Sequence, residues 1–360
     1  MLRRLLDQPD DFAKHLRDLT GTIIMSVTYG IDVLPENDPY IAIAETAMHG
    51  MSEATIPGRF LVDFIPLLKY VPAWMPGVDF QRKAKAWRDC TMQLVENPFA
   101  VVQQKLAKGE AMEPSFVSYC LGNMDSSGGD IDVQQRIIRD TAASLYEAGS
   151  DTTVSALNTF VLAMVCHPEV QRKAQTELDR VLPPGHLPDF SDEQALPYLS
   201  AIIKEVLRWQ PVVPLAVPHY ATNDDTYNNY HIPAGSTVIG NAWAMLHDES
   251  IYPDPDTFNP DRFMKDGKLN PDIRDPSMAF GFGRRFCPGR HMAISSIWIA
   301  AASILTTFHL SKAVDNDGRV IEPSQEYLSG LIAHPLPFKC MIRPRSTEAV
   351  SLICSAAAVV

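Results

Sequence analysis

One decapeptide, FGFGRRFCPG at residues 280–289, is the most informative part of this chain. Its two glycines permit a tight turn, and Pro-Gly before an apolar helical pattern is typical of a chain that enters a helix. We therefore expect the thiol of Cys287 to lie at a helix N-terminus. There the helix dipole and the free backbone N–H groups favour the thiolate, which is a nucleophile or a metal ligand. Arg285, two residues earlier, adds a positive charge suited to a carboxylate partner.

Three interpretations of this decapeptide compete. A dinucleotide-binding loop is the weakest, because the third glycine position holds Phe286 and no Rossmann strand pattern precedes it. A structural buried cysteine is the default for any lone cysteine. The third interpretation is a proximal thiolate for haem iron, which pushes electron density towards oxygen cleavage. The pattern F-x-x-G-x-R-x-C-x-G has five fixed positions, so a chance match to it is improbable.

A second pattern suggests a buried charge network. Glu205 and Arg208 are one helical turn apart, and on their own they predict no more than a surface salt bridge. Arg262 lies in a Pro-bounded turn, DPDTFNPDRF at residues 254–263, between this helix and the cysteine. The three side chains could together fix an irregular segment of chain. Their desolvation would be acceptable only if every charge is hydrogen bonded.

The longest helical pattern runs from Val133 to Cys166 and contains the hexapeptide AGSDTT at residues 148–153. Small and hydroxyl-bearing residues are poor choices for a helix interior. One interpretation is a simple Ser/Thr-rich bend. The other is a helix that opens to admit a ligand or water, because Thr competes for the carbonyl four residues earlier. In that case Asp151 and Thr152 would relay protons to a bound oxygen species.

Apolar periodicity predicts a mainly α protein with small, late β-hairpins, an α+β fold. The first helix is expected over 9–34, with apolar residues from Phe12 to Val27 on one face and a stop at Pro35. Further helices are expected over 37–54, from Gln81, and over 133–166, 169–182, 192–209 and 289–309, and hairpins after Pro211 and over 335–345. Because there is no internal repeat and no linker, residues 1–360 are expected to form a single domain.

The segment FLVDFIPLLKYVPAWMPG, residues 60–77, is apolar but interrupted by prolines, which forbid one continuous helix. A buried irregular connection and an apolar surface loop explain it about equally well. A surface loop of this kind would contact a membrane interface or line a ligand entrance. The basic helix start that follows it, QRKAKAWRDC from Gln81, is most simply a solvated face.

Composition opposes several classes of protein. The 360 residues include 31 basic and 43 acidic ones, a net charge of −12, which argues against a general nucleic-acid binder. Six scattered cysteines without a CxxC pair indicate reduced thiols rather than a disulfide framework. Neither the charged start, MLRRLLDQPDDFAKHL, nor the short apolar tail over 349–360 predicts a membrane span, so no part of the chain is expected to cross a bilayer.

Four segments in this order resemble motifs of the cytochrome P450 family of haem-thiolate monooxygenases: AGSDTT, EVLR (205–208), FNPDRF (258–263) and FGFGRRFCPGRHMA (280–293). The late GLIAHPLPFKCMIRPR (330–345) is similar to the family's C-terminal hairpins, and most similar to those of fungal members. The resemblance covers essentially the whole chain. It implies a cytochrome P450-like fold that lacks the N-terminal anchor, first sheet and first helices of full members, so the chain is expected to be N-terminally truncated.

The resemblance also implies roles for individual residues. Cys287 would be the axial ligand of haem b iron, with Phe280 packed near the thiolate, and Arg285 and His219 would bind haem propionates. Asp151 and Thr152 would handle proton delivery and oxygen activation. Gly289, Ala148 and Gly149 would also border the cofactor. Glu205, Arg208 and Arg262 would hold the cysteine loop, and Leu331 and Ile332 would touch the substrate.

The implied activity is that of an oxidoreductase which inserts one oxygen atom from O2 into an apolar small molecule, in secondary metabolism. Electrons would come from NADPH-cytochrome P450 reductase, which would dock near Arg284 and Arg290. The resemblance implies that the protein is located at the surface of the endoplasmic reticulum membrane, with peripheral contact through residues 60–77. It implies no nucleic-acid partner. Two alternatives stay open: a haem-thiolate isomerase or dehydratase, which would not need the Asp151–Thr152 relay, and a non-catalytic remnant.

Overall fold

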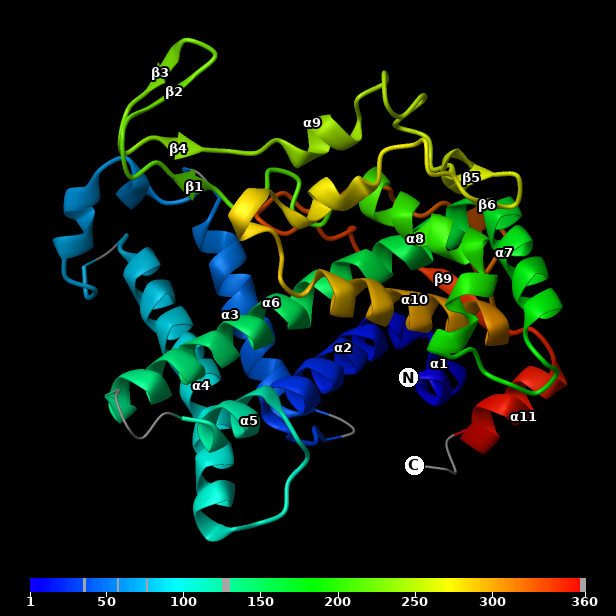
Figure 1. Ribbon diagram of the computed structural model, residues 1–360, viewed down its shortest axis with the longest axis horizontal. Helices are drawn as coiled ribbons and strands as arrows, with labels where there is room; N and C mark the ends of the chain where they lie inside the picture. The colour runs from blue at the N-terminus through cyan, green and yellow to red at the C-terminus, as the bar shows by residue number, and fades with distance from the viewer. Residues whose placement is uncertain (35–36, 57, 76, 125–129, 357–360) are drawn as a thin grey trace. The chain divides into compact units, whose positions relative to one another are not determined.

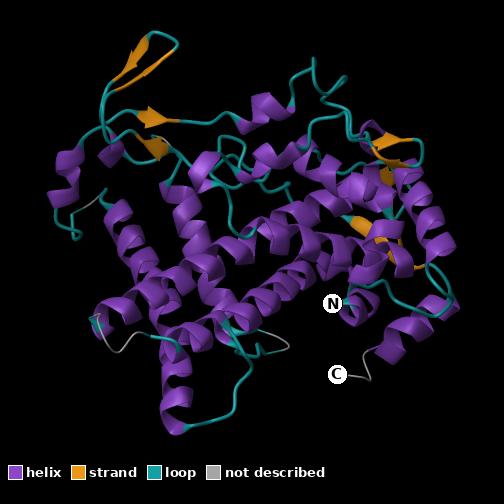
Figure 2. Ribbon diagram, in the orientation of Figure 1, coloured by secondary structure: helices purple, strands orange, loops and turns teal. Residues whose placement is uncertain are grey.

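The computed structural model describes residues 1–34, 37–56, 58–75, 77–124 and 130–356 (Figure 1). Helices predominate in these ranges, and the strands described are short and come late in the chain (Figure 2). The expected mainly α fold with small β-hairpins is therefore confirmed. The chain divides into two compact units. We call residues 13–154 the N-terminal unit, and residues 1–12 together with 155–360 the C-terminal unit. The prediction of a single domain stays a prediction.

The described residues of the N-terminal unit contain helices and loops. Its elements are α2 (Phe12–Tyr29), α3 (Pro39–Ala54), η2 (Leu61–Asp63), η3 (Pro66–Tyr70), α4 (Asp79–Lys108), α5 (Phe116–Gly122) and the first part of α6 (Ile131–Cys166). The helices α3 and α4 pack closely together. A Cβ atom on Gly50 of α3 would lie 2.4 Å from the ring of Trp87 in α4, so only glycine permits this approach.

The prediction of one helix over 9–34 is wrong in its bounds. The structure divides this stretch into η1 (Pro9–Asp11) and α2, and α2 ends at Tyr29. The cause is Gly30, which has a φ of +63° and would bring a Cβ atom within 2.5 Å of the Glu113 carbonyl oxygen. Pro35, the expected stop, lies outside the described residues. Val27, expected on the buried face, is 50% exposed.

The C-terminal unit contains most of the core and all of the described strands. Its helical elements are α1 (Leu2–Asp7), η1, the end of α6, α7 (Pro168–Val181), η4 (Phe190–Ala195), α8 (Pro197–Trp209), α9 (Ala242–Leu246), η5 (Pro260–Phe263), η6 (Pro276–Phe280), η7 (Gly283–Arg285), α10 (Arg290–Thr307) and α11 (Thr347–Ala356). The helix α10 packs against α7 and α8. Residues 154–165 of α6 and almost all of α8 are buried, so these helices form the core.

All described strand pairs are antiparallel. Two-stranded ladders join β1 (His219–Tyr220) to β4 (Thr237–Val238), β2 (Asp225–Tyr227) to β3 (Tyr230–Ile232), and β5 (Met264–Lys265) to β6 (Lys268–Leu269). The three-stranded sheet has the order β8 (Val320–Ile321), β7 (Phe308–Val314), β9 (Cys340–Pro344). The hairpins expected after Pro211 are therefore confirmed, whereas the described run over 335–345 forms no hairpin of its own and contributes the strand β9, which pairs with β7.

Two findings concern the exclusions made from composition. All six cysteines are free thiols. Within the described ranges, none of the helices combines the length with the apolar composition that crossing a bilayer requires. The last four residues of the apolar tail, 357–360, lie outside the described residues.

Candidate functional site

The cysteine loop, residues 280–289, connects η6 to the first turn of α10. Gly281 has a φ of +89° and Gly283 a φ of +55°, in the left-handed region that glycine adopts without strain. The backbone N–H of Cys287 donates to the carbonyl oxygen of Phe280 at 2.9 Å and closes the loop. This turn fixes the direction in which the side chain of Cys287 projects from the backbone.

The half-buried thiol of Cys287 lies just before the N-terminus of α10, as the sequence predicted. Gly289 is the N-cap of this helix, and its carbonyl oxygen accepts from Ala293 at 2.9 Å. A Cβ atom on Gly289 would lie 3.9 Å from Cys287 Sγ, an ordinary contact. Cys287 therefore lies two residues before the N-cap of an 18-residue helix, at the positive end of the helix dipole.

Two cations of the predicted site belong to the same unit as the thiol. Arg285 and His219 are exposed, and neither forms an ion pair within the part of the chain that the structure describes. Arg290, in the first turn of α10, places its guanidinium 5.1 Å from the centroid of the Phe286 ring. The Arg285 guanidinium and the ring N–H of His219 are therefore available as hydrogen-bond donors for an anionic ligand.

The predicted charge network is present and fully buried. The side chains of Glu205 and Arg208 are 0% exposed, and Arg208 donates to Glu205 through Nε at 2.7 Å and Nη2 at 2.9 Å. Arg262 Nε lies 3.2 Å from the same carboxylate, and the backbone N–H of Asn259 donates to it at 2.8 Å. One carboxylate thus pairs with two guanidinium groups.

The same two arginines fix the irregular chain before η5. Arg208 Nη1 donates to the Leu246 carbonyl oxygen at 3.0 Å, and its Nη2 donates to that of Pro255 at 2.7 Å. Arg262 Nη1 donates to the Pro253 carbonyl oxygen at 2.6 Å. The sequence implied that every buried charge of this network must be hydrogen bonded, because desolvation is otherwise too costly. These bonds meet that requirement. The network therefore anchors a Pro-rich stretch that has few backbone hydrogen bonds of its own.

The hexapeptide at residues 148–153 lies in the N-terminal unit, within one continuous helix. Thr152 Oγ1 donates to the Ala148 carbonyl oxygen at 2.7 Å, which is the competition for the i−4 carbonyl that the sequence predicted. A Cβ atom on Gly149 would lie 2.7 Å from Ile24 Cδ1, so glycine permits α2 to pack closely against α6. Ala148, Gly149, Asp151 and Thr152 are thus brought together on neighbouring turns of α6.

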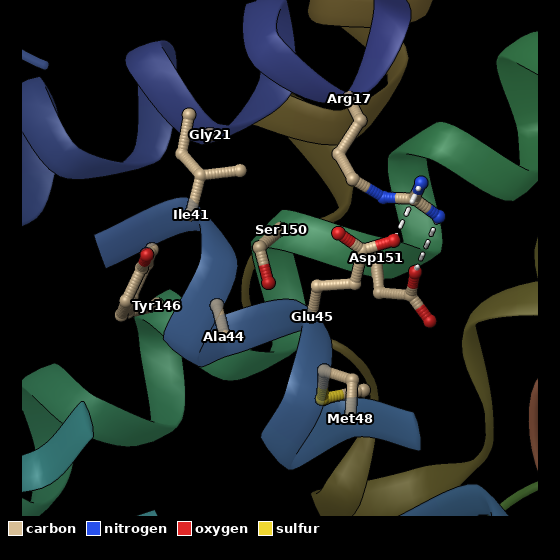
Figure 3. A pocket seen from close by; sticks show the side chains of 9 residues that line it. All are labelled: Arg17, Gly21, Ile41, Ala44, Glu45, Met48, Tyr146, Ser150 and Asp151. Atoms are coloured by element: carbon tan, nitrogen blue, oxygen red, sulfur yellow. Dashed lines mark ion pairs between the residues drawn. The ribbon is translucent and has the colours of Figure 1, made fainter. Parts of the chain in front are cut away.

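Asp151 has an ionic neighbour that the sequence did not reveal. Arg17 of α2 places Nη1 at 3.1 Å from Glu45 Oε1 of α3, and Nη2 at 3.9 Å from Asp151 Oδ1 (Figure 3). The three side chains line a small cavity of about 10 Å³, together with Ser150. This ion-pair group was missed because its members are far apart in the sequence and no motif joins them.

Leu331 and Ile332, the predicted substrate contacts, lie in a loop that is fixed to its surroundings. Ile332 is buried and Leu331 half-buried. The next residue, Ala333, donates through its N–H to the Val212 carbonyl oxygen at 2.9 Å and accepts from the hydroxyl of Ser155. Contact of this loop with a substrate stays a prediction.

Comparison with known proteins places the chain in a family. The sequence profile described as "Cytochrome P450" matches residues 1–341. This chain belongs to the cytochrome P450 family. A cytochrome P450 monooxygenase of Armillaria gallica is 49% identical over 355 residues, which cover 98% of this chain and 69% of the relative.

Two further cytochrome P450 relatives come from other fungi. A cytochrome P450 monooxygenase of Rhodocybe pseudopiperita is 48% identical over 354 residues, covering 98% of this chain and 67% of the relative. The tryptamine 4-monooxygenase of Psilocybe cyanescens is 43% identical over 351 residues, covering 97% and 69%. The resemblance to fungal cytochromes P450 is therefore confirmed, and with it the class of an oxygen-incorporating oxidoreductase. This family in general has a haem-iron cofactor, a redox partner and a small-molecule substrate.

The residues of this cytochrome P450 fit a haem. Among the described residues there is no group of three or more His, Cys, Asp or Glu side chains that could hold a metal ion by itself. A half-buried thiol at a helix N-terminus can instead supply a single axial bond to an iron whose other ligands belong to a porphyrin. Two exposed donor side chains without acidic partners in the described residues, Arg285 and His219, are suited to its carboxylates.

Proposed function

We propose that this cytochrome P450 is a haem-thiolate monooxygenase that inserts one oxygen atom from O2 into a C–H bond of an apolar small molecule. The second oxygen atom leaves as water, and NADPH supplies the two electrons that balance the reaction. A bound haem b would supply the oxygen-activating chemistry. The observation that carries the proposal is the Cys287 thiol, held at the N-terminus of α10 by the bond between its backbone N–H and Phe280.

In this proposal the cysteine loop is the cofactor site. Cys287 ligates iron as the thiolate, and the phenyl ring of Phe280 packs near the sulfur. Gly289 leaves the space beside the sulfur free of a side chain. Arg285 and His219 bind the propionates, because both are exposed cationic or hydrogen-bonding groups without acidic partners in the described residues.

The same proposal assigns proton delivery to α6. Thr152 offers a hydroxyl whose proton is directed at the Ala148 carbonyl, so its lone pairs are available to accept from water or from a bound oxygen species. Asp151, beside Arg17, holds or releases the proton. Ala148 and Gly149 border the cofactor in this proposal; the methyl group of Ala148 is exposed, whereas Gly149 packs against Ile24 of α2.

A Thr152→Val variant tests this relay without changing the shape of the side chain. With the hydroxyl lost, a larger share of the NADPH oxidised should end as hydrogen peroxide instead of hydroxylated product. A matched Thr159→Val variant, further along α6, should leave that share unchanged. An unchanged peroxide fraction in Thr152→Val would refute the role of this hydroxyl.

The proposal includes a peripheral membrane contact through residues 60–77 at the endoplasmic reticulum. The described residues of this segment, 60–75 and 77, expose large apolar side chains, among them Leu67 (73% exposed) and Trp74 (80% exposed). Pro76 lies outside the described residues. Such an exposed apolar surface is unusual for a protein that remains in water alone. NADPH-cytochrome P450 reductase would supply electrons, with Arg284 and Arg290 at its docking surface.

An absorption spectrum tests the central assignment. The purified chain is loaded with haem, reduced, and exposed to carbon monoxide, for the wild type and for Cys287→Ser. We expect the red-shifted band of thiolate-ligated ferrous haem in the wild type and its loss in the variant, with unchanged circular dichroism. The control is Cys354→Ser, on exposed α11, which should keep the band. A band that persists in Cys287→Ser would overturn the assignment.

A further inference from the structure

The first turns of α4 carry positive charge that the proposed function does not use. Arg82, Lys83, Lys85 and Arg88 are all exposed. Asp79, the one acidic residue among these turns up to Arg88, pairs with Arg82. Over residues 59–89 six basic residues outnumber three acidic ones, although acidic residues outnumber basic ones 43 to 31 in the whole chain. The charge of this region is therefore opposite to that of the molecule.

This basic surface adjoins the apolar segment directly. The amide of Gln81, in the first turn of α4, donates to the carbonyl oxygen of Lys69 at 3.2 Å and to that of Val71. Trp87 packs its ring against Phe60, with 6.0 Å between the ring centroids. The end of η3 is thus joined to the first turn of α4, and Phe60 contacts the same helix two turns later.

Helix geometry places Arg82 and Lys85 away from the packed face. Trp87 faces α3, because Gly50 makes room for its ring. Arg82 and Lys85 are three residues apart, on one face of α4, and a turn of 100° per residue puts that face roughly opposite Trp87. Lys83, four residues before Trp87, lies at the edge of the packed face, and Arg88 lies between the two faces; both are exposed. These guanidinium and ammonium groups therefore point to solvent beside the apolar segment.

The exposed apolar side chains are too many for a solvated loop. Seven large ones are between 40% and 80% exposed: Leu61, Phe64, Ile65, Leu67, Tyr70, Trp74 and Met75. An apolar surface that inserts into the headgroup region, bordered by cations, gains from both the hydrophobic effect and attraction to anionic lipids. An acidic protein would match the cations but not this apolar area, so a lipid surface fits both features.

We infer that the apolar segment and the basic start of α4 form one docking surface that recognises anionic phospholipid headgroups. The inference rests on the membrane contact in the proposed function and adds the charge of the lipid. The apolar side chains enter the interface, and Lys83, Lys85 and their neighbours contact the headgroup phosphates and carboxylates. This replaces the simpler interpretation of the basic stretch as a solvated face.

Vesicle binding tests the inference on the full chain. Sedimentation measures the affinity for phosphatidylcholine vesicles and for vesicles that also contain phosphatidylserine. We expect tighter binding to the anionic vesicles at low salt, and a K83Q/K85Q variant that loses about tenfold or more of that affinity, since each cation near such a surface contributes up to about fivefold. High salt should remove the difference between the vesicles.

The matched control is K105Q/K108Q, which removes half-buried Lys105 and exposed Lys108 from the other end of the same helix. It should bind like the wild type. A Trp74→Ser variant should weaken binding to both kinds of vesicle, which reports the apolar contribution separately. Circular dichroism confirms that the variants fold.

The outcomes separate this inference from the proposed membrane contact. Equal binding to both vesicle types, independent of salt, would overturn the anionic preference and leave the apolar contact standing. Equal losses in K83Q/K85Q and K105Q/K108Q would overturn the assignment of the preference to this surface. Absence of binding to either vesicle would overturn the membrane contact itself, together with this inference.

Discussion

Replacing Glu205 by Gln is the most direct perturbation of the buried charge network. Gln has almost the same shape and keeps one carbonyl oxygen, which can still accept from the backbone N–H of Asn259. Its NH2 group is a donor, however, and it would face the guanidinium donors of Arg208 or Arg262. The substitution therefore removes the counter-charge of two arginines and turns at least one hydrogen bond into a repulsive contact.

The expected loss follows from the burial of the charges. Glu205 and Arg208 have no exposed side-chain surface, and Arg262 has 5%. Breaking a fully buried ion pair by removal of one partner costs about 3–5 kcal/mol, because the remaining charge stays desolvated. The network contains two such charges, but carbonyl oxygens of the Pro-rich stretch still accept from both arginines. We therefore expect about 3–5 kcal/mol rather than twice that value.

Urea unfolding followed by tryptophan emission measures this loss, and one of the five tryptophans, Trp209, reports directly on this region. Trp209 Nε1 donates to the Asp256 carbonyl oxygen at 2.9 Å, within the stretch that the network fixes. A loss of this size should lower the urea midpoint by about 1 M or more. The matched control is Glu322→Gln, which breaks a surface pair with Lys312 and should cost less than about 1 kcal/mol. If both variants unfold at the same midpoint, the network does not stabilise the fold as argued.

Three further outcomes follow from the structure. In a Gly240→Ala variant the added Cβ would lie 2.4 Å from the ring of Phe282 in the cysteine loop. The variant should therefore destabilise the C-terminal unit by about 1–3 kcal/mol and take up haem less tightly in a titration. In timed alkylation read by mass spectrometry, exposed Cys354 should react first and Cys340 last, because burial raises the pKa of the Cys340 thiol to about 12 and keeps it protonated at pH 8. Bound haem should protect Cys287 from the same reagent, and unchanged reactivity with haem would contradict iron ligation.

Much of the fold was predictable because its signals are local. The central helix over 133–166 was expected within two residues of its observed bounds, since its apolar positions repeat over many turns. The network of Glu205, Arg208 and Arg262 was expected because two members share one helix face and the third lies in a rigid turn. The cysteine loop was expected because glycine, proline and cysteine each carry a conformational or chemical meaning there.

The rest depends on tertiary packing that no local pattern records. From its sequence the segment over 60–77 could be buried or exposed, since the same pattern of apolar residues is compatible with a connection in the core and with a surface that contacts a membrane. The segment is buried only if another element of the fold covers it. Among the described residues no element does so, and its large apolar side chains are exposed. The end of α2 was misplaced for a related reason. Gly30 ends the helix where the Glu113 carbonyl comes close, and Glu113 is remote in the sequence.

Arg17 shows how such a remote contact changes the interpretation of a motif. Its guanidinium is closer to Glu45 (3.1 Å) than to Asp151 (3.9 Å), but Glu45 is 55% exposed and the Asp151 side chain only 15%. The attraction between two charges weakens as the local dielectric constant rises and as the distance grows. Solvent therefore weakens the shorter Arg17–Glu45 pair more than the longer Arg17–Asp151 pair. Arg17 therefore holds both carboxylates, and α2, α3 and α6 meet at this cation. The acid of the hexapeptide is thus part of the packing of the N-terminal unit, and any proton it carries is exchanged beside a fixed positive charge.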